Sequence, residues 1–165
     1  MTETTLPVSL ALLNFAGTLA RRDPAGFAPK VTMLTHVGYN WRDEETIVFR
    51  LADRAVRVWG AAMLELNDRK VDADTLRALV PLTDRESCTA ASATLESIDF
   101  VIVSHARDCA SSAAGGAGGP EFVGSQAAYA AIALANRYTD QRKQDVYESA
   151  AALLNELRSG FELLH

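Results

Sequence analysis

Residues 109–138 read CASSAAGGAGGPEFVGSQAAYAAIALANRY, in which four glycines and a proline stand directly before an alanine-rich run. Glycine-rich loops occur as phosphate cradles and also as joints between helices. Gly119 and Gly124 have the five-residue separation of the P-loop glycines, but that motif continues with lysine, and this chain continues with Ser125 and Gln126. The stretch is therefore not a P-loop.

The dinucleotide-binding pattern is not matched either. After Gly116 and Gly118, the third glycine position holds Glu121, and no strand is expected before it. Backbone amides at the start of the next helix could still bind an anion. The preferred interpretation is a flexible joint between two helices at about residues 113–121, because glycines end helices. No cofactor is expected.

Outward from this joint, apolar residues recur at helical spacing along most of the chain. Asp23 and Pro24 indicate an N-cap followed by a first helical residue, and Thr83 with Glu86 has the spacing of a capping box. The expected helices cover about residues 6–22, 24–37, 43–66, 72–80, 84–111, 122–138 and 140–161. We therefore expect an all-α bundle of six or seven helices.

The third of these helices is expected to be the longest core-facing element of the first half. Its inward stripe comprises Ile47, Leu51, Ala55, Val58 and Ala62. Beyond the joint, the alanine-rich run should let another helix approach closely at Ala128, Ala131, Ile132 and Ala135.

One segment, residues 98–103, would also suit a buried strand, since periodicity cannot decide so short an apolar run. Length and alanine-rich flanks favour a helix. On a single helix, Cys88 and Cys109 would lie about 30 Å apart and could not form a disulfide. Both are expected to be small apolar residues in a reducing compartment.

Composition limits the classes of function. The chain of 165 residues is 48% hydrophobic, which is enough for one core, so a single helical domain over residues 1–165 is expected. A formal net charge of −5 opposes binding to a phosphate backbone. The sequence contains neither a membrane span nor the positive start of a secretory signal. We expect a cytoplasmic protein with no nucleic-acid or membrane partner.

The segments LLNFAGTLARRDPAGF (residues 12–27), FRLADRAVRVWGAAM (49–63) and LTDRESCTAASATLESIDFVIVSHARD (82–108) follow a recognisable order. They form a two-helix opening, a helix with a tryptophan, and a long helix rich in small and β-branched residues. In this order the chain resembles the YjaG-like family, small helical bacterial proteins of unknown function. The resemblance covers about residues 10–138 and implies an all-helical fold, but it supplies no catalytic residues.

No metal site is expected. The three histidines form no His-Glu-x-x-His pair, and only Glu162 and His165 have the Glu-x-x-His spacing of a helical di-iron site. Glu96 and Asp99 would share a helix face, where solvation or contact with a partner explains them better than catalysis.

Two function hypotheses remain open. The preferred one is a non-enzymatic module that binds another protein, as an inhibitor or immunity-type protein does, or that forms a homodimer. Its candidate interaction residues are Tyr39, Trp41, Asp43, Glu44 and Glu45, which combine aromatic side chains in a turn with an acidic run.

The alternative is a small-ligand binder or hydrolase-like enzyme that uses His105 and Asp108, with Cys109 as a thiol. It depends on residues 98–103 forming a strand, because α/β proteins bind ligands in the loops at the carboxyl ends of strands. On a helix, the adjacent Ser104 and His105 point about 100° apart and cannot act as a pair.

Overall fold

The computed structural model describes residues 8–36, 44–98 and 100–161, and within them every regular element is a helix. The elements are α1 (Leu10–Ala20), α2 (Pro24–His36), α3 (Glu44–Arg54), the π-helical segment η2 (Ala55–Gly60), α4 (Ala61–Leu66), α5 (Lys70–Arg77), α6 (Arg85–Glu96), α7 (Phe100–Ala113), α8 (Gly119–Ala135) and α9 (Gln141–Phe161). The segments α3, η2 and α4 are continuous, so the described residues form eight helices. The predicted all-α bundle is confirmed, with one helix more than expected.

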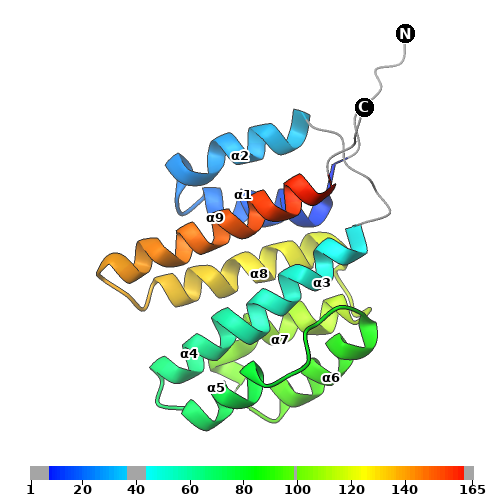
Figure 1. Cartoon of the computed structure of the whole chain (residues 1–165), viewed down its shortest axis with the longest axis vertical. Helices are drawn as coiled ribbons and strands as arrows, with labels where there is room; N and C mark the ends of the chain where they lie inside the picture. Colours follow the sequence, from blue (N-terminus) through cyan, green and yellow to red (C-terminus); the bar gives the residue numbers. More distant parts are fainter. Residues whose placement is uncertain (1–7, 37–43, 99, 162–165) are drawn as a thin grey trace.

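Helix α8 lies in the middle of the bundle and packs against α1, α3, α7 and α9 (Figure 1). Small residues make this central position accessible, and Ala128, Ala131 and Ala135 are buried in it, as predicted. The two backbones approach closely at Gly124, where an added Cβ would lie 2.2 Å from the carbonyl oxygen of Ala11. The helix that approaches the alanine-rich run most closely is therefore α1.

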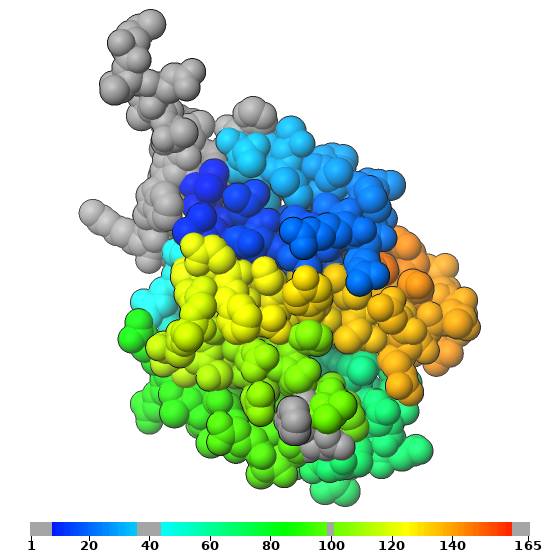
Figure 2. Space-filling view, turned by 180° about the vertical axis from the view of Figure 1, so that it is seen from behind, coloured from blue at the N-terminus to red at the C-terminus, as the bar shows by residue number. Residues whose placement is uncertain are grey.

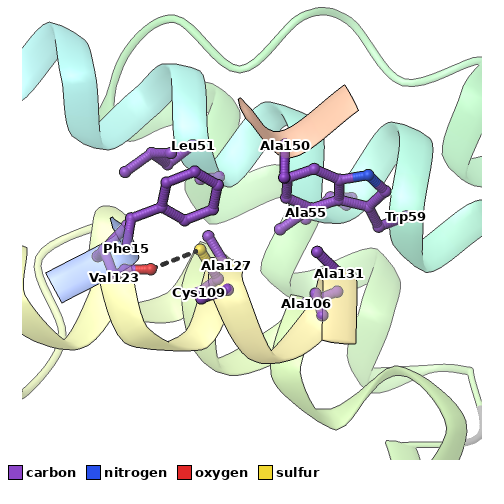
Figure 3. Close-up of a cluster of buried hydrophobic side chains, with 14 of the residues drawn as sticks. Phe15, Leu51, Ala55, Trp59, Ala106, Cys109, Val123, Ala127, Ala131 and Ala150 are labelled. Atoms are coloured by element: carbon purple, nitrogen blue, oxygen red, sulfur yellow. Dashed lines mark hydrogen bonds between the residues drawn. The ribbon is translucent and has the colours of Figure 1, made fainter. Parts of the chain in front are cut away.

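The core is built around an aromatic pair at the centre of the bundle. The rings of Phe15 and Trp59 stack with centroids 6.1 Å apart and an interplanar angle of 16°. Leu51, Ala55 and Ala127 surround them (Figure 3). All of these side chains are fully or almost fully buried, so α1, α3, η2 and α8 share one core.

The long helix of the first half contains the π-helical segment, which the sequence did not predict. A π-turn includes an extra residue, so it rotates the following side chains relative to an α-helical stripe. Trp59 and Gly60 consequently face the core, whereas Val58 is 45% exposed. The prediction that Val58 belongs to the inward stripe is wrong for this reason.

The predicted helix over 84–111 is two helices. Helix α6 ends at Glu96, where the Ser97 hydroxyl donates to the carbonyl of Thr94, and α7 begins at Phe100 and packs back against α6. The strand alternative for 98–103 is wrong in the part described, since the helix begins at Phe100 and is only kinked at Val103. The single-helix placement of the two cysteines is wrong as well.

The capping of α6 also differs from the prediction by one residue. Asp84 is the N-cap, and its carboxylate accepts a hydrogen bond from the amide of Ser87 at 2.8 Å. The Ser87 hydroxyl accepts from the amide of Asp84 in return, which gives a reciprocal capping box. The helix thus begins where expected, but Thr83 and Glu86 are not its capping pair.

The glycine-rich joint lies where it was predicted. Helix α7 ends at Ala113 and α8 begins at Gly119. Gly115, Gly118 and Gly119 have φ angles of 105°, 110° and 65°, in the left-handed region that side chains disfavour. None of the helices within the described ranges is both long and apolar enough to cross a membrane.

Candidate functional site

A cleft of about 500 Å³ opens where the glycine joint meets the first residues of α3 and α6. Val48, Ala113 and Val123 form its floor, and each is at most 7% exposed because it belongs to the core. Two side chains at the rim, Glu45 and Arg85, carry opposite charges. The cleft therefore has an apolar floor and a charged edge.

Glu44 lines this cleft but also holds the fold together. Its Oε1 accepts a hydrogen bond from the backbone amide of Ala11 at 2.7 Å. The first amides of a helix lack partners within the helix, and Ser9 satisfies only that of Leu12 through its hydroxyl. Glu44 thus completes the N-terminal cap of α1 from a distant part of the sequence.

Glu45 and Arg85 interact more loosely. The Nε atom of Arg85 lies 3.6 Å from Oε1 of Glu45, and their side chains are 71% and 62% exposed. An exposed pair of this kind contributes about 0–1 kcal/mol to the stability of the fold. Either side chain can therefore leave the pair and bind another molecule at little cost in stability. The backbone of Gly115 lies next to the Arg85 guanidinium.

Ser112 closes the inner side of the cleft at the end of α7. Its hydroxyl donates to the carbonyl of Ala117 and so fixes the start of the joint. This contact and the left-handed glycines shape the loop that lies beside Arg85.

The predicted interaction residues are only partly described. Tyr39, Trp41 and Asp43 lie outside the described residues. Glu44 and Glu45 are brought to the cleft, where they meet the glycine joint from a distant part of the chain. Both features stand out in the sequence, but no sequence signal indicates that they meet, and none points to Arg85.

The three residues of the catalytic alternative all lie on α7, but each has a different partner. Nδ1 of His105 is 2.8 Å from Oε1 of Gln126, and its ring lies beside that of Tyr129, 5.4 Å between centroids. Asp108 pairs with Arg107 at 3.5 Å. His105 is thus tied to α8 and not to Asp108.

Cys109 is unsuited to nucleophilic chemistry. It is fully buried, and its Sγ contacts the carbonyl oxygen of Val123 at 3.5 Å (Figure 3). Burial raises the pKa of the Cys109 thiol far above its ordinary value, and burial raises that of Cys88 to about 12. Both thiols remain protonated at neutral pH, whereas nucleophilic attack needs the thiolate.

The acidic residues give no metal cluster in the described part of the chain, where no group of three His, Cys, Asp or Glu side chains converges. Glu96 is the last residue of α6, so it does not share a continuous helix with Asp99, which lies outside the described residues. Glu162 and His165 lie outside them too.

Comparison with known proteins gives no assignment: no family model, no curated protein and no solved structure matches the chain. The resemblance to the YjaG-like family stays a prediction.

Proposed function

We propose that the chain is a non-enzymatic protein-interaction module and that its partner inserts a segment with a basic side chain into the cleft at the glycine joint. The observation that carries the proposal is the cleft itself, which combines an apolar floor with exposed charges. Such a module acts by covering a surface of its partner, as inhibitors and immunity proteins do.

The chemistry of the partner follows from the charges around the cleft. Two carboxylates, Glu44 and Glu45, line it against one guanidinium, that of Arg85. A lysine or arginine from the partner would pair with Glu45 while its aliphatic stem covers the apolar floor. The net charge of −5 attracts a basic partner over a longer range.

The enzyme alternative receives less support. The helix from Phe100 removes the strand end on which that hypothesis depended, and the cleft contains none of His105, Asp108 and Cys109.

Photo-crosslinking tests the proposal. Because Cys88 and Cys109 are buried, a maleimide benzophenone reacts selectively with a new surface cysteine at Thr46, beside Glu45. We expect a crosslinked product with a protein from the source cells. A matched probe at Ala152, which is exposed on α9, should give none.

Affinity for the crosslinked protein then tests the charge argument. Glu45→Lys should weaken binding about tenfold, since it places like charges together. Glu148→Lys, the same change at an exposed site on α9, should have an effect below about twofold. A product of twice the chain's mass would assign the cleft to a homodimer, and equal labelling from both probes would contradict the proposal.

A further inference from the structure

A second cleft, of about 350 Å³, lies at the opposite end of the bundle and is lined entirely by polar or charged residues. It opens between the turn that joins α1 to α2 and the turn that joins α8 to α9, which lie at the same end in Figure 1. Figure 2 shows the start of α9, in orange, beside the blue residues at the end of α1. The lining residues are Arg22, Asp23, Asp140, Lys143, Gln144 and Tyr147.

The most informative of these residues is Tyr147, which is only 7% exposed. Its ring packs edge-on against Phe27, with centroids 6.5 Å apart, so the side chain is fixed. Its hydroxyl makes no hydrogen bond with the described residues and is not one of their buried polar atoms, so it is accessible from the cleft. Tyr147 lines the cleft, and the charges that act on its hydroxyl are those of Asp23 and Arg22.

The carboxylates of the cleft are already occupied. Both oxygens of Asp140 accept hydrogen bonds from the guanidinium of Arg142, at 2.7–3.2 Å, and Arg142 also lies over the ring of Tyr138. Asp23 accepts from the amide of Gly26 at the start of α2, at 3.3 Å. The charge of Asp140 is therefore balanced by Arg142, whereas Asp23 keeps its negative charge, so the cations Arg22 and Lys143 outnumber the one carboxylate without a cationic partner.

The donors of the cleft, in contrast, are unused. Arg22, Lys143 and Gln144 are exposed, and they make no side-chain hydrogen bond or ion pair with any residue that the structure describes; neither does the hydroxyl of Tyr147. Two cations, an amide and a phenol therefore face one small cleft. Groups of these types together are suited to an oxyanion, which accepts several charge-assisted hydrogen bonds at once.

We propose that this cleft binds a small oxyanion, a phosphate or carboxylate group, between Arg22, Lys143 and the hydroxyl of Tyr147. Arg22 supplies the planar pair of donors that matches two oxygens of such a group. Lys143 supplies a second positive charge, and Tyr147 donates from a ring that is held in place by Phe27. The cleft, of about 350 Å³, has room for such a group.

Titration with inorganic phosphate tests the site, with acetate in a parallel series and chloride at the same ionic strength as the reference. The full chain is followed by amide NMR. We expect saturable shifts around the α1–α2 and α8–α9 turns, with a dissociation constant of about 1 mM or tighter for at least one of the two oxyanions. Comparison of the two series distinguishes a phosphate from a carboxylate ligand.

Three variants make the assignment specific. Arg22→Gln should weaken binding at least tenfold, and Tyr147→Phe should weaken it about fivefold, because each removes a hydrogen bond to a charged ligand. Lys70→Gln removes an exposed lysine from α5, away from the cleft, and should leave binding unchanged. Tyr147→Phe keeps the buried ring, so the folded state is retained.

Three results would overturn the proposal: no saturable shift with either oxyanion, equal shifts with chloride, or Arg22→Gln binding as tightly as the unmodified chain. A loss caused by Lys70→Gln equal to that caused by Arg22→Gln would also overturn it, since it would indicate general attraction of anions.

Discussion

The two clefts lie at opposite ends of α8. In the cleft at the glycine joint most polar side chains have partners within the chain, whereas in the cleft between the two turns four donors have none among the described residues. At the first end, Glu44 caps α1, Ser112 fixes the joint and Glu45 lies near Arg85. At the second end, Tyr147 and the cations beside it face the cleft without partners in the described residues.

Two helices connect these ends. Both α1 and α8 run from the joint to the turns, and they touch along their length (Figure 1). The amide of Ala11 takes its cap from Glu44, and the carbonyl of the same residue contacts Gly124. The side chains at the joint end are thus held by contacts within the chain, whereas the donors at the turn end have no such contacts in the described residues.

The largest effect is expected where α1 and α8 touch. Gly124→Ala places a methyl group 2.2 Å from the carbonyl oxygen of Ala11, so the two helices must separate. We expect a loss of about 3 kcal/mol in the free energy of unfolding, measured by urea denaturation. Gly17→Ala is the matched control, because an added Cβ there has no atom within 4 Å.

The control should change stability in the opposite direction. Gly17 lies within helix α1, and alanine at this position lowers the conformational entropy of the unfolded chain. The substitution should therefore stabilise the folded protein by about 0.5–1 kcal/mol. If both variants lost similar amounts, the close contact between α1 and α8 would be contradicted.

A smaller effect is expected at the joint itself. Gly118 has a φ of 110°, and an added Cβ would lie 2.5 Å from Cβ of Phe122, so Gly118→Ala should cost about 2 kcal/mol. At Gly119 the nearest atom is the flexible Glu121 Oε2, at 3.1 Å, and alanine should cost about 1 kcal/mol. Thermal unfolding of the two variants checks this order, and the reverse order would rule out the described joint conformation.

The next comparison separates two neighbouring carboxylates. Glu44→Ala leaves the amide of Ala11 without its acceptor and should destabilise by about 1 kcal/mol. Glu45→Ala removes only an exposed ion pair and should change stability by less than about 0.5 kcal/mol. Chemical denaturation of both variants measures the difference. Equal losses would mean that Glu44 does not cap α1.

The sequence predicted the helices well because periodicity and local caps decide them. Pro24 begins a helix and the glycines end one, and both signals act within a few residues. It failed where tertiary packing decides. Nothing local indicates that the chain turns at Ser97 or that a π-turn moves Val58 to the surface, because both depend on neighbouring helices.

The candidate sites were harder to predict for the same reason. Glu44 and Glu45 were singled out from their acidic run, but the partners Ala11 and Arg85 are 33 and 40 positions away. The second cleft was not predicted, since Arg22 lies in the turn between α1 and α2, Tyr147 lies on α9, and the two share no motif. Only the fold brings them together.

The smallest expected effect is a pH dependence at the turn end. The Arg142 guanidinium and backbone amide hold the pKa of Asp140 down at about 2, below its ordinary value of 3.8. A carboxyl group whose pKa is lower in the folded state adds stability above its unfolded pKa and loses it as the pH falls. Asp140→Asn should therefore be slightly less stable than the unmodified chain above about pH 4, and this gap should close between about pH 4 and pH 2. Urea midpoints measured across that range provide the check. A gap that widens as the pH falls would contradict a lowered pKa and therefore the pairing of Asp140 with Arg142.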